Sequence, residues 1–303
     1  MPSEYRPSGL FVPVVTPFDG DDRVDLDALE GLAVKALDAG ASGLVGLSTT
    51  GEPTALTAEE RAATVRTLAD VCGDRGADLI VGAGTNDTRE TIARHEALGA
   101  IGAVSASLAV VPYYVRPLES AIVAHFQAVA ERSPVPLVLY NVPYRTGRGL
   151  GAGALLELAA TPNVAGLKQA VGALDADTLA LLAGAPDGFA VLGGDDAYLL
   201  PTVLMGGAGA IAAAANLCTD RFAAMLAAGA EGDVAASRPH AEALLPLTFA
   251  LFAEPNPAVI KAVLHRDGLI PTPDVRLPLG NATPGAVEAA VAAVEAARAP
   301  VGG

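Results

Sequence analysis

The chain alternates eight times between a short apolar run and a longer segment of helical periodicity, and this alternation constrains its fold more than any other feature. The apolar runs cover residues 10–18, 42–48, 78–84, 104–111, 136–142, 164–170, 189–195 and 207–213. The helical segments cover residues 25–38, 57–71, 87–98, 117–131, 152–160, 174–183, 196–205 and 219–228. Repeated strand–helix units predict a parallel sheet with helices outside it, and eight units are the number that closes a (β/α)₈ barrel.

An open, doubly wound α/β sheet is the alternative fold. That fold would carry a glycine-rich phosphate loop after its first strand, and the segment found there, TPFDGDDRVDL, has no such pattern. We therefore predict an α/β protein whose residues 1–231 form a (β/α)₈ TIM barrel. Residues 232–303 are predicted to form a small C-terminal helical region, with helices at 232–252, 257–267 and 284–298.

Two helix starts can be predicted from capping signals. Thr57 is followed three residues later by Glu60, which is the spacing of a capping box. In the segment EPNPAVIKAVL, Asn256 is expected to be the N-cap and Pro257 the first helical residue.

Charge and composition exclude several classes of function. The formal net charge of −15 argues against binding to nucleic acid or to an anionic membrane surface. The apolar run 207–217 is too short to cross a bilayer, and residues 1–10 lack a signal pattern. Cys72 and Cys218 have neither metal-site nor disulfide spacing, so the cytoplasm is the expected location.

A lysine lies inside the apolar run VAGLKQAVG at residues 164–172. It is Lys168, one of three lysines in the chain, the others being Lys35 and Lys261. Burial of an ammonium group is costly, and it lowers the pKa of the amine until the neutral form can attack a carbonyl carbon. A structural lysine that pairs with a carboxylate or reaches solvent is equally compatible with this strand alone.

Other polar residues are expected at the C-terminal ends of the strands, where the active sites of such barrels lie. The fifth strand ends with Tyr140, and Arg145 follows in its loop. The tyrosine could move protons at an imine and the arginine could bind a carboxylate, but a packed tyrosine and a solvated arginine fit as well.

The second strand ends in LSTTGEPTAL, and its hydroxyl and backbone N–H groups could cradle a small carboxylate. These groups belong to Thr49, Thr50 and Gly51, whereas Glu52 is expected to hold the loop by hydrogen bonds.

The remaining polar strand ends can be interpreted structurally. The adjacent Tyr113 and Tyr114 follow the fourth strand and fit a packing role. Asp195 and Asp196 follow the seventh strand, where we favour helix capping over a metal site. No metal site and no serine or cysteine triad is expected.

Taken together and in order, these motifs resemble the dihydrodipicolinate synthase and N-acetylneuraminate lyase family of pyruvate-dependent class I aldolases. The fragments that carry the resemblance extend from about residue 10 to 280 and are STTGE, PYYVRP, YNVPYRTG, GLKQA, GGDDA and EPNP. The resemblance implies that Lys168 forms a Schiff base with pyruvate and that no cofactor is needed. It also implies that Tyr140, Thr49 and Tyr114 relay protons, with Tyr114 supplied by a neighbouring subunit of a homo-oligomer, expected to be a dimer of dimers.

The resemblance further implies how the substrates bind. Thr50 and Gly51 would hold the pyruvate carboxylate, and Gly194 and Ile211 would line the pocket. Arg145 stands where the synthase branch binds the carboxylate of the aldehyde, aspartate semialdehyde, on the route to diaminopimelate and lysine. Two alternatives stay open: another pyruvate aldolase or 2-keto-3-deoxy sugar-acid dehydratase, and a non-catalytic paralogue that keeps the barrel.

Overall fold

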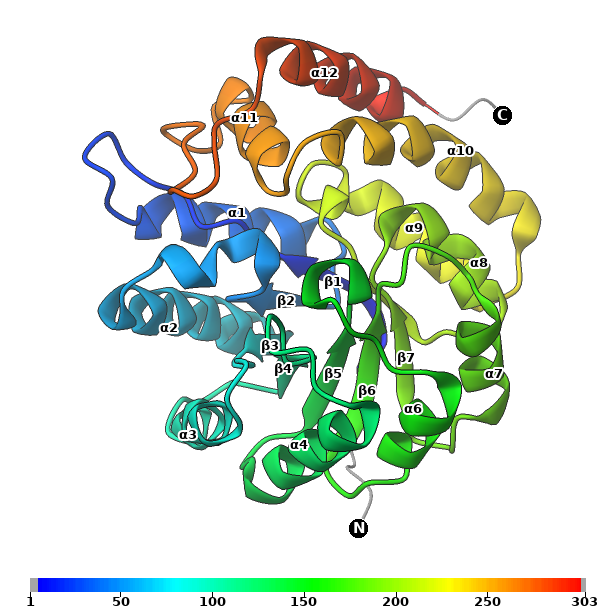
Figure 1. Ribbon diagram of the computed structural model, residues 1–303. Coiled ribbons are helices and arrows are strands. Elements are labelled where there is room, and N and C mark those ends of the chain that lie inside the picture. The colour runs from blue at the N-terminus through cyan, green and yellow to red at the C-terminus, as the bar shows by residue number, and fades with distance from the viewer. Residues whose placement is uncertain (1–4, 301–303) are drawn as a thin grey trace.

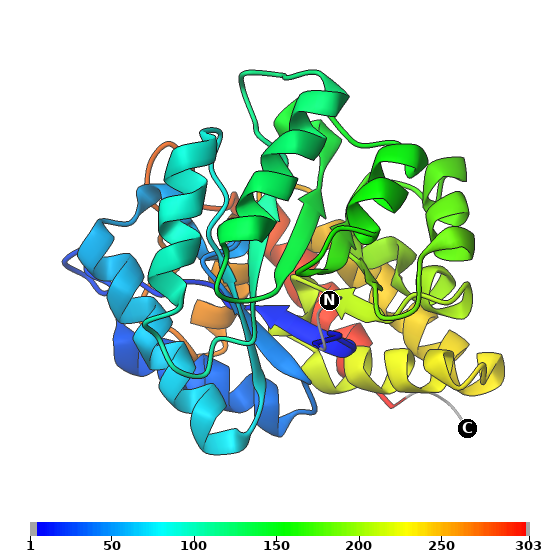
Figure 2. The same cartoon turned by 90° about the horizontal axis from the view of Figure 1, so that it is seen from below.

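Eight parallel strands close into a barrel in the computed structural model, which describes residues 5–300 (Figures 1 and 2). Each strand pairs with its neighbours in sequence, and β8 pairs with β1 to complete the ring. The strands are β1 Gly9–Pro13, β2 Gly43–Gly46, β3 Asp78–Gly82, β4 Ala106–Val110, β5 Leu137–Asn141, β6 Val164–Gln169, β7 Ala190–Gly193 and β8 Gly209–Ile211. The predicted (β/α)₈ barrel is confirmed.

Helices surround the barrel at the predicted places. They are α1 Leu26–Asp38, α2 Ala58–Arg75, α3 Thr88–Leu98, α4 Glu119–Arg132, α6 Ala152–Ala159, α7 Ala176–Gly184, α8 Leu199–Leu204 and α9 Thr219–Ala230. A short helix that the sequence did not predict, α5 Pro143–Thr146, follows β5. The predicted helix 196–205 is divided into a 3₁₀ turn, η3 Asp196–Tyr198, and α8. In this turn the Asp196 carboxylate accepts a hydrogen bond from the Ala214 backbone.

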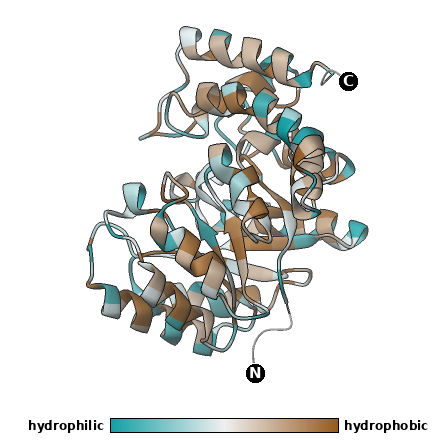
Figure 3. Ribbon diagram, turned by 90° about the vertical axis from the view of Figure 1, so that its right-hand side faces the viewer, coloured by the Kyte–Doolittle hydropathy of each residue, from teal (hydrophilic) through white to brown (hydrophobic). Residues whose placement is uncertain are grey.

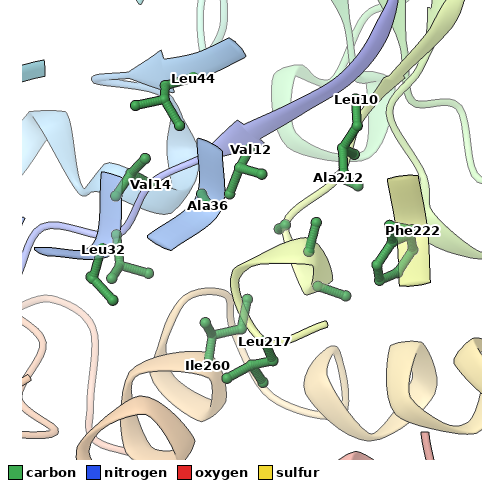
Figure 4. Close-up of a cluster of buried hydrophobic side chains, with 14 of the residues drawn as sticks. Leu10, Val12, Val14, Leu32, Ala36, Leu44, Ala212, Leu217, Phe222 and Ile260 are labelled. Atoms are coloured by element: carbon green, nitrogen blue, oxygen red, sulfur yellow. The ribbon is translucent and has the colours of Figure 1, made fainter. Parts of the chain in front are cut away.

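Both faces of the strands are buried, which explains why the runs are apolar throughout rather than alternating. Figure 4 shows Leu10 and Val12 of β1 among side chains of α1, α9 and the C-terminal helix α11 Ala258–Arg266. Phe11, between them in sequence, belongs instead to the cluster that fills the barrel interior. In Figure 3 the strands at the centre are brown and the hydrophilic residues lie on the outer helices and loops.

The C-terminal helices pack on one side of the barrel, in the upper part of Figure 1. They are α10 Val234–Leu251, α11 and α12 Pro284–Arg298, and α10 packs against both α9 and α12. Their apolar side chains belong to the same buried cluster as those of β1 and α9. We therefore propose that the described parts of the two predicted regions, residues 5–231 and 232–300, form one packed unit. In the described range 5–300, no helix is long and apolar enough to span a membrane.

One of the two predicted helix caps is confirmed and the other is wrong. Thr57 accepts a hydrogen bond from the Glu60 backbone at 3.2 Å, and the Glu60 carboxylate accepts one from the Thr57 backbone at 2.8 Å. Helix α11 begins one residue later than predicted, with Pro257 as its N-cap. Asn256 does not cap it, because its side chain is bound to a residue of the β2 loop, as described below.

Two buried histidines lie between α3 and α4. His95 on α3 is fully buried and its Nδ1 lies 3.4 Å from the Ser133 hydroxyl. His125 on α4 is also buried, with its Nδ1 2.9 Å from the Thr88 hydroxyl. Burial lowers the pKa of each imidazole to about 4; the neighbouring His125 adds to this for His95, whereas Asp87 opposes it for His125. Both histidines are therefore neutral in the folded protein near neutral pH.

We expect this pair to make the fold sensitive to acid. The unfolded chain binds protons on these histidines below pH 6.5, whereas the folded protein does so only near pH 4. The free energy of unfolding should therefore fall by roughly 2 to 3 kcal/mol per histidine between pH 6.5 and about pH 4.5. Chemical denaturation of the wild type, His95→Asn and His125→Asn across this range measures the effect. An unchanged pH slope in both variants would contradict the assignment.

Candidate active site

Lys168 is buried at the C-terminal end of β6 and faces the barrel interior. Its neighbour Leu167 belongs to the buried cluster between the strands and helices α4 and α6. Because successive side chains of a strand point to opposite faces, Lys168 points into the barrel. Lys168 is paired in register with Tyr140 of β5, and its Nζ lies 4.5 Å from the centre of the Tyr140 ring. Only 6% of Lys168 is exposed.

Burial gives Lys168 the properties of a reactive amine. It lowers the pKa of the ammonium group to about 8, although the carboxylates of Asp196 and Asp195 oppose this and the positive charge of Arg145 adds to it. A lysine of this pKa is present partly as the neutral amine near neutral pH, and a neutral amine attacks carbonyl carbon. The side chain is therefore suited to form a Schiff base.

The residue after β7 makes room for the lysine side chain. A Cβ atom on Gly194 would lie 2.8 Å from Cγ and 2.9 Å from Cε of Lys168, which is too close for any side chain. Glycine at this position thus lets the β7 loop lie directly against the lysine. Ile211, on β8, is fully buried in the barrel-interior cluster that also contains Tyr140.

Tyr140 lies beside the lysine and is hydrogen-bonded to Thr49. Tyr140 is 7% exposed, and burial raises the pKa of its hydroxyl, while the charge of Arg145 and a hydrogen bond with Thr49 oppose the rise. Thr49 begins the 3₁₀ turn η1 Thr49–Gly51, separated from the end of β2 by two residues. The two hydroxyl groups can therefore exchange a proton with each other.

The η1 turn is held in place by a hydrogen bond from the C-terminal region. Thr50 is buried, and its hydroxyl oxygen accepts a hydrogen bond from the Asn256 side chain at 3.0 Å, which leaves the hydroxyl proton free to donate. The carbonyl oxygen of Gly51 accepts a hydrogen bond from the Thr16 hydroxyl at 2.8 Å. The backbone conformation here is fixed by contacts distant in sequence.

Glu52 fixes the same loop, as the sequence predicted. Its Oε1 accepts a hydrogen bond from Nζ of Lys261 at 2.8 Å, and both side chains are buried. Its Oε2 accepts one from the Arg276 backbone at 2.9 Å. Both partners belong to the C-terminal region, and the sequence offered no sign of either contact.

A pocket of about 550 Å³ opens beside these residues. Its wall includes Thr49, Tyr140, Arg145, Tyr113 and Asn256. Pockets of this volume are of the size that binds small molecules.

Arg145 lies at the edge of this pocket on α5. Its side chain is exposed, its Nε donates a hydrogen bond to the Tyr144 hydroxyl at 2.9 Å, and its guanidinium carbon lies 4.9 Å from the centre of the Tyr144 ring. The tyrosine orients the guanidinium group while leaving other N–H donors open to a ligand.

Tyr114 is not brought to the site within one chain. It is 88% exposed and adopts the left-handed backbone conformation, with φ 69°. Val115 and Leu118 of the same loop, and Tyr144 of α5, are also exposed.

The prediction that Asp195 and Asp196 cap a helix is wrong. Neither side chain caps the turn that follows β7. Asp195 accepts a hydrogen bond from the Gly172 backbone at 2.6 Å, and Asp196 accepts one from the Ala214 backbone at 2.6 Å. The carboxylate of Asp196 acts on the charge of Lys168, a relation that the sequence analysis did not predict; its place shortly after a strand adjacent to the lysine strand was the available signal. No cluster of metal-ligating side chains occurs within residues 5–300.

The fold and the site define a (β/α)₈ enzyme with a reactive, buried lysine. The chain belongs to the dihydrodipicolinate synthetase family, whose model matches residues 6–297. This confirms the resemblance drawn from the motifs.

Relatives and solved structures agree with this assignment. The chain is 41% identical over 274 residues to a 4-hydroxy-tetrahydrodipicolinate synthase of Moorella thermoacetica, covering 90% of this chain and 92% of the relative. It is 38% identical over 288 residues to one from Neisseria meningitidis serogroup C, covering 95% and 98%. The structure of dihydrodipicolinate synthase from Acinetobacter baumannii complexed with pyruvate has a TM-score of 0.92 and 33% identity, covering 96% and 98%. That of the Thermotoga maritima enzyme has a TM-score of 0.92 and 31% identity, covering 97% and 99%.

Proposed function

We propose that this chain catalyses the 4-hydroxy-tetrahydrodipicolinate synthase reaction, in which pyruvate condenses with aspartate semialdehyde. The observation that carries the proposal is Lys168, which is buried, has a lowered pKa and lies directly beside Tyr140. Tyr140 in turn lines the pocket. The names of the relatives and the bound pyruvate of one structural neighbour support the choice of substrates.

The reaction begins at the amine of Lys168. Its nitrogen forms a bond to the keto carbon of pyruvate, the carbonyl oxygen leaves as water, and an imine remains. Loss of a methyl proton gives an enamine, whose carbon then bonds to the aldehyde carbon of the second substrate. Tyr140 and Thr49 would carry protons between these groups, because the Tyr140 ring lies beside the amine and the two side chains are hydrogen-bonded to each other.

The remaining residues would bind and position the substrates. The Thr50 hydroxyl and the adjacent backbone of the Thr49–Gly51 turn would hold the pyruvate carboxylate, because hydrogen bonds to Asn256 and Thr16 fix this loop. The Gly51 N–H itself donates to the Ser48 carbonyl oxygen within the turn, so Gly51 would contribute its backbone shape. Gly194 provides the space for the lysine side chain, and Ile211 closes the interior of the barrel near it.

A homo-oligomer completes this proposal. Tyr114 would act as the third member of the proton relay only if it entered the site of a neighbouring subunit, and its exposure fits that arrangement. Exposed Val115, Leu118 and Tyr144 provide apolar surface for the same contact. We propose a dimer of dimers, although a monomeric dihydrodipicolinate synthase variant is known among the structural neighbours. Sedimentation that shows a fully active monomer would refute it.

A cytoplasmic location fits the two free thiols, Cys72 and Cys218.

The substrate assignment is tested by turnover. The purified protein should consume pyruvate and aspartate semialdehyde together and form the cyclic product. Cleavage of a 2-keto-3-deoxy sugar acid, with no activity toward the semialdehyde, would replace the proposed reaction by another of the same family.

Arg145→Ala should lose recognition of the aldehyde. A hydrogen bond to a charged group contributes about 1.5 to 3 kcal/mol, so kcat/KM for aspartate semialdehyde should fall roughly 10- to 100-fold. Imine formation with pyruvate should be retained. Arg148→Ala removes an exposed arginine from the same loop and is the matched control. Equal kcat/KM values in the wild type and Arg145→Ala would exclude the assigned role.

A further inference from the structure

The turn after β7 carries an acidic group, Asp196, whose charge acts on Lys168. The backbone N–H of Gly194 donates a hydrogen bond to the carbonyl oxygen of Gln169, the residue after Lys168, at 2.8 Å. The two strand ends therefore stay together beyond the barrel. Gly194 lies directly against the lysine side chain. Asp196 follows only two residues further along the turn, and it is only 8% exposed.

The Asp196 carboxylate has one oxygen bound and one oxygen available. Its Oδ2 accepts the hydrogen bond from the Ala214 backbone, whereas its Oδ1 is buried and has no hydrogen-bond partner in the described part of the chain. A buried carboxylate oxygen without a partner is costly. Burial raises the pKa of Asp196 to about 6, and the backbone N–H of Ala214, the charge of Lys168 and the backbone N–H of Ala213 oppose the rise.

Three other polar groups act on the Lys168 amine, and none is a buried anion like Asp196. Asp195 is less buried than Asp196, and its Oδ2 is bound to the Gly172 backbone. Arg145 carries the same charge as the lysine and therefore disfavours its charged form. Tyr140 presents a ring and a hydroxyl whose pKa is raised by burial, so it is neutral. Asp196 is thus the buried negative charge that acts on the lysine from the β7 side.

We propose that Asp196 is the counter-charge of the imine on Lys168. This inference rests on the proposed function, because it requires that imine. When the neutral amine and a ketone condense, a carbon–nitrogen bond forms, and the carbonyl oxygen leaves as water with one nitrogen proton and one proton from solution. The nitrogen keeps its other proton and becomes positively charged as the imine forms. The site must therefore hold a cation that the neutral amine did not carry. The Asp196 carboxylate offsets that charge where water is excluded.

The test is the affinity of the protein for pyruvate as an imine, measured by borohydride trapping and intact mass. Asp196→Asn removes the charge but keeps the shape and an oxygen that accepts from the Ala214 backbone. At about pH 9, above the pKa of Lys168, the neutral amine is the starting form in both proteins, and the pyruvate concentration for half-maximal trapping should rise about 10- to 100-fold in Asp196→Asn. Asp195→Asn, which removes a charge from the same turn, is the matched control and should change it less than threefold.

A second measurement distinguishes charge from structural damage. Trinitrobenzenesulfonate reacts with neutral amines, and peptide mapping isolates Lys168 from the other two lysines. Loss of the Asp196 charge should move the pH profile of this labelling about one unit lower, because the ammonium form has lost its partner. Loosening of the site would instead expose the amine and move the profile higher. Asp196→Ser provides a second neutral variant, and Asp196→Glu, which retains the charge, should trap pyruvate more tightly than Asp196→Asn.

The outcomes separate the two proposals. Trapping in the wild type with weaker trapping and a lower pH profile in Asp196→Asn supports the inference. Equal trapping and an unmoved profile in the neutral variants would overturn the inference and leave the proposed function intact. Absence of any adduct in the folded wild type would overturn both.

Discussion

Lys168→Met should form no borohydride-trapped adduct with pyruvate, and its turnover should fall at least about 10⁴-fold. The variant keeps the length and apolar stem of the side chain, so the buried strand β6 should still pack. What disappears is the only group at this position that can bond covalently to the keto carbon. Intact mass after borohydride treatment, followed by peptide mapping, measures the adduct, and a continuous assay measures turnover.

Lys35→Met is the control for this experiment. Lys35 lies exposed in the last turn of α1, away from the C-terminal ends of the strands where the site lies. Its replacement should therefore change neither adduct formation nor turnover. An adduct that persists in Lys168→Met, or one that maps to another lysine, would show that the reactive amine lies elsewhere.

Lys261→Met should destabilise the protein by about 3 to 5 kcal/mol, because it leaves the Glu52 carboxylate buried without its partner. The ion pair is 0% and 1% exposed on its two sides, so water cannot replace the lost contact. Nζ of Lys261 also lies 3.9 Å from the centre of the Phe18 ring, and burial lowers the pKa of this lysine while Glu52 opposes that effect. Denaturant unfolding at neutral pH gives the change in free energy.

Two further variants make this prediction specific. The double variant Glu52→Gln/Lys261→Met should recover part of the loss, since no unpaired charge remains. Arg238→Ala breaks an ion pair with Glu242 whose partners are 67% and 72% exposed, and it should cost less than about 1 kcal/mol. A loss in Lys261→Met no larger than in Arg238→Ala would contradict the assignment.

The Glu52–Lys261 pair also explains why the C-terminal helices matter for the site. Glu52 follows directly after the Thr49–Gly51 turn, and Asn256 holds Thr50 of that turn. The groups that would bind the pyruvate carboxylate are thus positioned by side chains of the last third of the chain. A barrel without these contacts would carry the same motif without a fixed geometry.

The sequence by itself determined the barrel and its reactive strand. The eightfold alternation of apolar runs and helical segments gave the topology, because hydrophobic periodicity and capping residues such as Thr57 act over a few positions. It also placed Lys168 on a strand, Tyr140 and Thr49 at strand ends and Arg145 in the loop after the fifth strand. In a parallel barrel those ends meet on one face, so residues far apart in the chain could be brought together by topology alone.

Only the tertiary structure decided which side chains meet. Asn256 and Asp196 each follow a local pattern typical of a helix cap, yet both side chains bind partners elsewhere. Thr50 and Asn256 are 206 positions apart, and Glu52 and Lys261 are 209 apart. A local pattern describes which hydrogen bonds a residue can make with its near neighbours. Burial against another segment decides which of them it makes, because the segment packed against a side chain brings hydrogen-bond partners that its near neighbours in sequence do not offer.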